Sequence, residues 1–237
     1  MNGGGLSEKL CGLFQAGVAA AEMREPGDPA TLLPAEARHL QRAVPKRLRE
    51  FAAGRACARR VLAEFGIVNF PIEVAADRQP LWPDTIVGSI THTAGFCAAV
   101  AARRQSMAAI GIDSEAVGAV NEEIWPAICV AAETAWLESL PAGERIAAVT
   151  LIFSAKEAFY KCQYPLMRES LGFQDVRVEA SDWGAAAGAF TIHATRAIAL
   201  AQRTALPMRG RYLLHEEFLT AGIGLSAAAV SASTQAQ

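Results

Sequence analysis

The spacing of apolar residues in the first half of the chain predicts one helix followed by short strands. From Pro45 to Gly66, apolar residues recur every three or four positions, which is typical of a helix that begins at a proline and ends at a glycine. Apolar runs of strand length follow at Ile72–Ala75, Ile86–Ile90, Phe96–Ala101 and Met107–Ile112. Pro, Gly, Asp or Arg bound these runs, which together predict a small antiparallel sheet.

In the second half, predicted helices are likewise followed by predicted strands. Apolar positions at helical spacing predict a helix over residues 120–140, and after a break at residues 141–143 a longer helix is expected from about Glu144 to Tyr164, stopped by Pro165. Later runs predict the strands of a second sheet: Val176–Ala180, Ala189–Ala194, Tyr212–Phe218 and Ile223–Val230.

These elements predict an α+β fold of two halves, each a small, mainly antiparallel sheet packed with a long helix. The seam falls near residues 112–120, which divides the chain into an N-terminal half, residues 1–112, and a C-terminal half, residues 113–237. We find no sequence repeat between the halves, so any internal symmetry is structural only. The ends, Met1–Gly5 and Ser231–Gln237, are expected to be flexible.

Composition narrows the classes of function. The 237 residues carry a net charge of −2, which argues against a general nucleic-acid binder. No apolar run approaches the roughly 20 residues of a membrane-spanning helix. Five cysteines without a CxxC pair indicate a reducing compartment rather than a disulfide framework or a zinc site. Cys11–Ala21 resembles a signal peptide faintly, but Glu8 and Gln15 spoil that pattern. Gly17–Ala21 fits a first strand equally well, so we expect a cytoplasmic protein.

The end of the fourth predicted strand carries two acids. In the segment Gly111-Ile-Asp-Ser-Glu115, Asp113 and Glu115 point to the same side of an extended chain and Ser114 to the other. Two neighbouring carboxylates repel each other unless a cation or a proton intervenes. Mg²⁺ is a suitable cation, because it binds a few carboxylates together with phosphate oxygens. By themselves, however, two acids at a strand end are more often simply solvated.

The long C-terminal helix supplies a third acid. Glu157 and Lys161 lie one turn apart on one face, which by itself fits an ordinary surface ion pair. Phe153 shares that face, and Phe159 lies beside it, so a fully solvated stripe is disfavoured. A partly buried glutamate needs a partner, and a metal ion shared with Asp113 and Glu115 would provide one.

Basic and polar residues in the N-terminal half suit an anion. Arg47 and Arg55 lie about two helical turns apart, so they share a face and fit a polyphosphate clamp, although a solvated basic face is the commoner explanation. Thr91 and His92 follow a glycine and a serine near a strand end, a composition that suits anion contact only weakly. Arg78 lies in a loop rich in proline and aromatic residues.

In order along the chain, these segments resemble the surfactin-type phosphopantetheinyl transferases, especially the branch that contains enterobactin synthetase component D. The matching segments are Arg47 with Gly54-Arg55 and Ala58-Arg59, residues 78–83, residues 88–92, residues 111–115 and residues 153–161. The resemblance implies two pseudo-symmetric halves. It also implies a monomeric enzyme that moves 4'-phosphopantetheine from coenzyme A to a serine of an apo acyl or peptidyl carrier protein, in siderophore or secondary metabolite biosynthesis.

The resemblance also implies roles for individual residues. Asp113, Glu115 and Glu157 match the family's magnesium ligands, and the general base is either Glu157 or a metal-bound water. Lys161 and His92 match groups that would absorb the charge of the leaving group, adenosine 3',5'-bisphosphate. The coenzyme A contacts are matched by Arg47, Arg55, Arg78, Thr91, His92, Lys156 and Lys161.

Two other functions stay open. The same acids and cations suit a magnesium-dependent hydrolase of nucleotides or pyrophosphate, and a non-catalytic module that binds carrier proteins or coenzyme A is the second alternative. Walker-type loops, nucleophile elbows and dinucleotide fingerprints are absent from the sequence. Val117, Val120, Ile124 and Trp125 are candidates for docking a carrier helix, although apolar residues of this kind are more often core.

Overall fold

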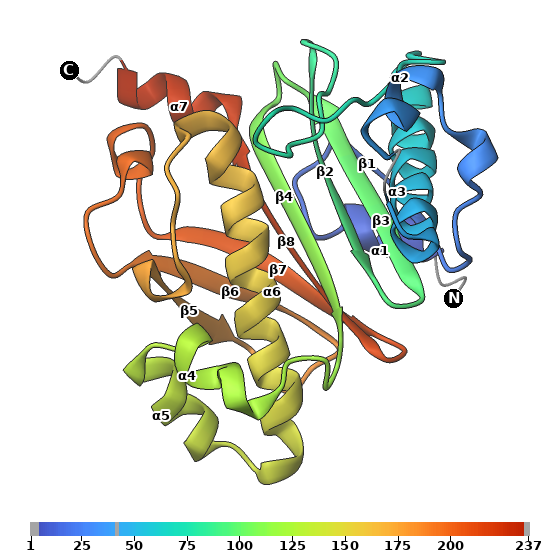
Figure 1. Cartoon of the computed structure of the whole chain (residues 1–237). Coiled ribbons are helices and arrows are strands. Elements are labelled where there is room, and N and C mark those ends of the chain that lie inside the picture. The colour runs from blue at the N-terminus through green and yellow to red at the C-terminus, as the bar shows by residue number, and fades with distance from the viewer. Residues whose placement is uncertain (1–4, 41–42, 235–237) are drawn as a thin grey trace.

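The computed structural model describes residues 5–40 and 43–234, and the side chains of His39 and of residues 231–234 lie outside that description. Most of the predicted flexible ends, residues 1–4 and 235–237, also lie outside it. The described chain forms two antiparallel sheets, each covered by a long helix, and the two halves lie side by side (Figure 1). This arrangement confirms the predicted α+β class.

The first sheet has the strand order β1-β3-β2. The strands are β1 (Val18–Met23), β2 (Ile86–Thr93) and β3 (Phe96–Arg103). Helix α3 (Pro45–Ala63) packs on one face through Cys57, Val61 and Leu62, and Leu10 of α1 (Leu6–Cys11) packs on the other. Residues 96–102 of β3 are all buried, because both faces of the sheet are covered. Short helical segments precede α3: Pro29–Thr31, α2 (Pro34–Ala37) and Arg38–Leu40.

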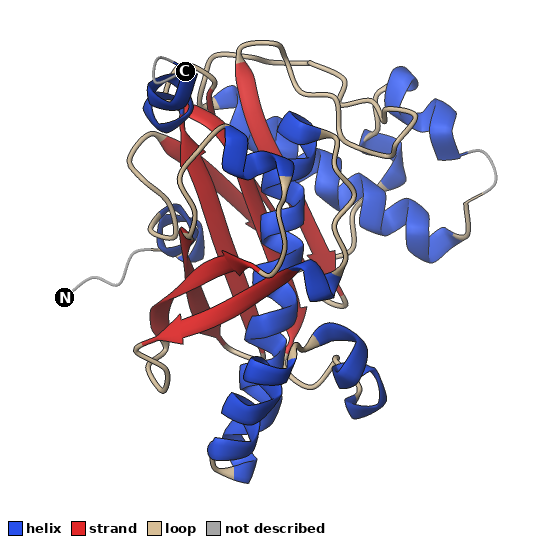
Figure 2. Cartoon of the chain, turned by 90° about the vertical axis from the view of Figure 1, so that its left-hand side faces the viewer, coloured by secondary structure: helices blue, strands red, loops and turns tan. Residues whose placement is uncertain are grey.

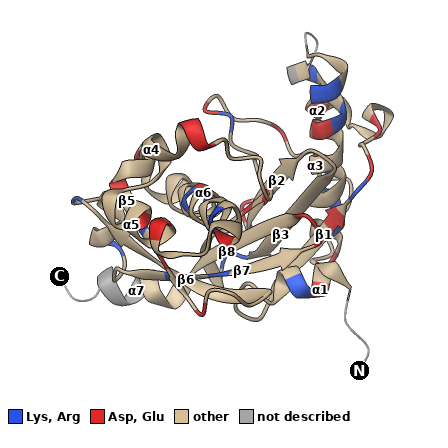
Figure 3. Ribbon diagram, turned by 90° about the horizontal axis from the view of Figure 1, so that it is seen from below, with Lys and Arg blue, Asp and Glu red and all other residues tan. Residues whose placement is uncertain are grey.

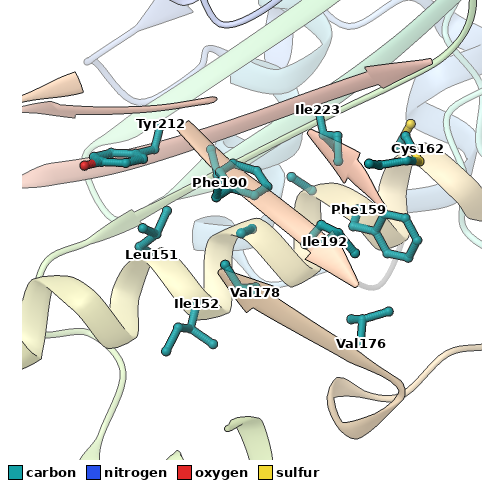
Figure 4. Close-up of a cluster of buried hydrophobic side chains, with 14 of the residues drawn as sticks. Leu151, Ile152, Phe159, Cys162, Val176, Val178, Phe190, Ile192, Tyr212 and Ile223 are labelled. Carbon is teal, nitrogen blue, oxygen red and sulfur yellow. The ribbon is translucent and has the colours of Figure 1, made fainter. Parts of the chain in front are cut away.

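The second sheet has the order β4-β8-β7-β6-β5. Its strands are β4 (Met107–Ala116), β5 (Val176–Ser181), β6 (Ala187–Ala194), β7 (Met208–His215) and β8 (Phe218–Ser226). Helix α6 (Ala142–Met167) runs across this sheet (Figure 2). Figure 4 shows Leu151 and Phe159 of α6 packed beside Val178 of β5 and Phe190 of β6. Each such side chain contributes roughly 1.5–3 kcal/mol through burial, so this core anchors the helix.

Two strand predictions were wrong, the first about the strand itself and the second about its partner. Residues 72–75 form no strand in the described chain; Val74 makes only an isolated bridge to Pro80. The run at 107–112 is a strand, but β4 pairs with β8 of the second sheet instead of with the first sheet. A strand that is buried on both faces carries no pattern that identifies its partner. The boundary predicted between residues 112 and 113 falls inside this strand.

The helix predictions were partly wrong at their ends. Residues 120–140 form separate segments, Glu122–Ile124, α4 (Trp125–Ile128) and α5 (Ala131–Ser139), because Cys129 and Val130 are extended. Pro165 does not stop α6, which ends where Arg168 takes up a left-handed conformation. A proline in the last turn removes only one hydrogen bond. The end of the last predicted strand, residues 227–230, belongs to helix α7 (Ala227–Thr234).

Side-chain hydroxyls join the two sheets at the seam, where β2 and β4 lie next to each other. The backbone N–H of Ile112 donates to Ser89 Oγ at 3.2 Å, and the N–H of Ser114 donates to Thr91 Oγ1 at 2.9 Å. These bonds satisfy buried N–H groups of β4 that no strand of the first sheet pairs with. The seam therefore holds residues 112–115 against β2.

Gly111 brings α6 into contact with β4. A Cβ atom at this position would lie 1.9 Å from the carbonyl oxygen of Ala158, which is backbone and cannot move aside. We therefore expect Gly111→Ala to destabilise the protein by about 1–3 kcal/mol or more, measured by urea unfolding. Gly143→Ala is the matched control, because nothing lies within 4 Å of its Cβ position and alanine favours the helix. Equal stability of the two variants would contradict this packing.

Candidate active site

A cavity of about 950 Å³ opens where the two halves meet. Its walls come from α3, the loop of residues 74–82, β2, β4 and α6. This volume is at the upper end of the range typical of small-molecule sites. The residues predicted from the sequence that line it are Arg47, Arg55, Arg78, His92, Glu157 and Lys161. Cations of the N-terminal half and an acid and a lysine of the C-terminal half therefore face one space.

Arg47 and His92 form a pair on the N-terminal wall. Arg47 Nη1 lies 2.9 Å from His92 Nε2. A guanidinium only donates, so Nε2 is the acceptor of a neutral imidazole. Partial burial and the charge of Arg47 both lower the pKa of His92 below its usual value. His92 thus orients Arg47 and adds no second positive charge.

Arg55 and Arg78 differ in their surroundings. Arg55 is buried: its Nε donates to the Ile72 carbonyl at 2.7 Å, and its guanidinium lies 3.9 Å from the Phe51 ring centroid. Burial lowers the pKa of Arg55 to about 10, so it remains charged at neutral pH. Arg78 is exposed in the loop, at a left-handed φ of 71°. Arg55 therefore also anchors the chain at Ile72, just before the loop, whereas Arg78 is an exposed part of the cavity lining.

Asp113 lies at the seam with one oxygen unpaired. Its Oδ1 accepts hydrogen bonds from Lys161 Nζ at 2.7 Å and from Thr91 Oγ1 at 3.3 Å. Its Oδ2 is buried without a hydrogen-bond partner among the described residues. Glu115, two residues on, accepts from Thr93 Oγ1 at 3.0 Å. An unpaired buried carboxylate oxygen is costly, so this position favours a cation.

The three predicted acids act on one another. Burial and then Asp113 raise the pKa of Glu115 to about 7, and the same two causes raise the pKa of Glu157. Lys161 lowers both, so the acids share one ammonium group. Within the described part of the chain, no three Asp, Glu, His or Cys side chains are arranged as a metal centre. The carboxylates of Glu115 and Glu157 are nevertheless close enough to Asp113 for its charge to raise their pKa.

The two lysines of the helix motif have different surroundings. Lys161 reaches Asp113 and the Ile112 carbonyl beside the cavity. Lys156 is 3% exposed, and its Nζ bonds to Glu133 Oε2 at 2.7 Å and to the carbonyls of Ile128 and Phe173, both at 2.8 Å. The structure therefore does not bring Lys156 to the cavity. Thr91 is also buried, and its hydroxyl contacts Asp113 instead of lining the cavity.

Residues that the sequence did not predict for the site also line the cavity. Tyr160 and Tyr164 of α6 stack with ring centroids 5.2 Å apart. Arg168 lies 5.9 Å from the Tyr164 centroid and forms an ion pair with Asp77. Helical spacing would have identified the tyrosines, because Tyr160 lies three positions after Glu157 and Tyr164 three positions after Lys161. The ion pair joins residues 91 positions apart, for which no local signal exists. Figure 3 shows that α6 carries both acidic and basic residues.

Two family models match consecutive parts of the chain. The 4'-phosphopantetheinyl transferase N-terminal domain matches residues 35–102, and the 4'-phosphopantetheinyl transferase superfamily matches residues 109–213. The chain is also 34% identical to 4'-phosphopantetheinyl transferase Npt of Nocardia iowensis over 76% of this chain and 82% of the relative. The chain belongs to the 4'-phosphopantetheinyl transferase superfamily. The cavity thus lies between the parts that the two models match.

Other relatives match shorter stretches. The chain is 41% identical to 4'-phosphopantetheinyl transferase Svp of Streptomyces mobaraensis over 65% of this chain and 63% of the relative. It is 39% identical to enterobactin synthase component D of Salmonella typhi over 52% of this chain and 50% of the relative. The match therefore spans less than two thirds of both relatives.

No described helix is both long enough and apolar enough to cross a membrane. All five cysteines lie in the described ranges as free thiols, and four of them are buried. The predictions of a cytoplasmic, monomeric protein remain predictions.

Proposed function

We propose that the chain transfers 4'-phosphopantetheine from coenzyme A to a serine of an apo acyl or peptidyl carrier protein. The observation that carries this proposal is that Arg47, Arg55 and His92 line the same cavity as Glu157 and Lys161. A substrate with a pyrophosphate needs cations on one side and a catalytic group on the other, and phosphoryl transfer relies mainly on such positioning. Membership of the superfamily supports this reaction.

We infer that Mg²⁺ is the cofactor and that Asp113, Glu115 and Glu157 would hold it, although the described side chains form no preassembled three-ligand centre. Oxygen ligands and an excess of negative charge suit this ion. The unpaired Oδ2 of Asp113 and the raised pKa of Glu157 support the assignment. When bound, Mg²⁺ would neutralise charge on the pyrophosphate as its bridging bond breaks.

The protein's own groups account for the proton and the leaving group. Glu157 takes the proton of the carrier serine, a role that suits a carboxylate whose pKa is raised by burial. The serine oxygen forms a bond to the phosphorus that bears pantetheine, and the bond from that phosphorus to the bridging oxygen breaks. Adenosine 3',5'-bisphosphate leaves with that oxygen, and Lys161 and Arg47 stabilise its charge.

The predicted substrate contacts divide into two groups. Arg47, Arg55, His92, Arg78 and Lys161 line the cavity and remain proposed contacts of coenzyme A. For Lys156 and Thr91 we propose supporting roles, because Lys156 is buried with Glu133 and Thr91 bonds to Asp113.

We also propose a place for the carrier and a branch of the family. Val117 and Ile124 are 37% and 45% exposed beyond the acids, whereas Val120 is 7% exposed and part of the core. Exposed apolar residues next to an active site suit a carrier helix. The identity to enterobactin synthase component D supports the surfactin-type branch and a role in siderophore or secondary metabolite biosynthesis.

The test is a transfer assay with purified protein, coenzyme A, Mg²⁺ and a panel of apo carrier proteins. We expect the intact mass of at least one carrier to increase by one phosphopantetheine, and an excess of EDTA to abolish the gain. Release of pantetheine phosphate without any carrier would instead identify a hydrolase. Binding of coenzyme A without either product would identify a non-catalytic module.

A further inference from the structure

Ser114 lies between Asp113 and Glu115 but points to the opposite face of β4. Its Oγ lies 2.7 Å from Thr220 Oγ1 of β8, and both residues are 0% exposed. Thr220 Oγ1 in turn lies 2.8 Å from His215 Nε2. The two strands pair in register at this point, with Ser114 opposite Thr220. A series of polar contacts, buried at Ser114 and Thr220, therefore begins directly behind the acids.

This series of polar contacts continues to the first sheet. His215 Nδ1 lies 3.4 Å from Arg24 Nη2, next to the end of β1. The Arg24 guanidinium is held in place, 4.8 Å from the Phe96 ring centroid and 5.0 Å from that of Phe218, with an ion pair to Glu216 at 3.0 Å. The contacts thus connect both sheets at the edge of the core that they share.

The hydrogen bonds of this series can all be assigned one direction, from Arg24 toward Ser114. Arg24 can only donate, so Nδ1 of His215 accepts and Nε2 carries the proton. Nε2–H then donates to Thr220, whose own hydroxyl hydrogen is left to donate to Ser114. Burial and the charge of Arg24 lower the pKa of His215 to about 4, which keeps the imidazole neutral at physiological pH. A single tautomer therefore fixes the orientation of every group.

Ser114 is held from both sides as a result. Its backbone N–H donates to Thr91 of β2 at 2.9 Å, and Thr91 also contacts Asp113. Its side chain is fixed from behind by Thr220. A rotation or a shift of Ser114 would move both neighbouring acids, because adjacent residues of a strand share one backbone.

We propose that Thr220, ordered by His215 and Arg24, is a positioning residue that holds Ser114 and thereby sets Asp113 and Glu115 for a divalent cation. This inference rests on the proposed function, in which these acids hold Mg²⁺. It assigns a role to residues of β7 and β8 that do not touch the cavity. Supporting residues behind metal ligands typically change metal affinity about 10- to 100-fold when they are mutated.

The experiment measures Mn²⁺ binding and transfer in Thr220→Val. Mn²⁺ is titrated into the protein with and without coenzyme A, and the free-ion paramagnetic resonance signal is compared with protein-free blanks. We expect binding about ten-fold weaker and a similar decrease in kcat, with KM for coenzyme A unchanged. Thr220→Ser keeps the hydroxyl and is expected to restore both. Thr150→Val removes a buried hydroxyl that bonds only within α6, so it is the matched control.

The outcomes separate the two proposals. A wild-type protein that neither binds Mn²⁺ nor transfers phosphopantetheine would defeat the proposed function. A competent wild type with Thr220→Val equal to Thr150→Val in Mn²⁺ affinity would overturn the positioning role. If Thr220→Val does not fold, Arg24→Met is tested in its place. Arg24 is 30% exposed and is the outermost residue of the series of polar contacts. Wild-type Mn²⁺ affinity in that variant would likewise overturn the role.

Discussion

Lys156→Met is expected to lower the free energy of unfolding by about 3–5 kcal/mol, the usual cost of removing one partner of a buried ion pair. The ammonium group bonds to Glu133 and to two backbone carbonyls, and both side chains are 1% exposed. Without Lys156, the carboxylate of Glu133 stays buried with only the N–H groups of Val130 and Val178 as partners. An uncompensated charge in this position is unfavourable.

Urea unfolding monitored by circular dichroism measures this effect. Lys46→Met is the matched control, because Lys46 is 78% exposed and its contact with Glu50 is 3.9 Å, so a change within about 0.5 kcal/mol is expected. Adding Glu133→Gln to Lys156→Met removes the orphaned charge and is expected to recover part of the stability. If Lys156→Met were as stable as Lys46→Met, Lys156 would not be the buried support that its contacts indicate.

Periodicity predicted the parts of the site that depend on one element. The alternation of an extended strand placed Asp113 and Glu115 on one face and Ser114 on the other, and the structure has this arrangement. Helical spacing likewise placed Glu157 and Lys161 on one face. The same rule indicates that Lys156, five positions before Lys161, lies about 140° away around the helix, on a different side. The resemblance to a family motif had grouped these two lysines.

Contacts between elements had no comparable signal. The pairing of β4 with β8 joins residues 107–116 to residues 218–226, and an almost fully buried strand fits either sheet. The ion pair of Asp77 with Arg168 and the contact of Thr220 with Ser114 likewise join distant parts of the chain. Such contacts depend on tertiary packing, which the spacing of residues along one element does not encode.

Glu157→Gln is expected to reduce phosphopantetheine transfer by about 10²–10⁴-fold, the range that a general base contributes. The substitution preserves the size of the side chain but removes its charge and its ability to accept a proton. Glu138→Gln is the matched control, because Glu138 is exposed on α5 and distant from the cavity lining, so its transfer rate is expected to equal that of wild type. The carrier mass assay measures both rates. Transfer by Glu157→Gln at the rate of Glu138→Gln would mean that the site is misassigned.

In the absence of metal, Glu157→Gln is expected to be at least as stable as wild type. Burial and Asp113 raise the pKa of Glu157, so in the folded protein its ionised form is disfavoured. A raised carboxyl pKa contributes stability that is fully present below the unfolded-state pKa and is lost as the pH rises through the folded-state pKa, so above that pH the ionised form is a cost that glutamine removes. Mn²⁺ titration of the variant then separates two roles for this carboxylate. Weaker Mn²⁺ binding together with lost transfer assigns Glu157 as a ligand, whereas unchanged binding with lost transfer assigns it as the base alone.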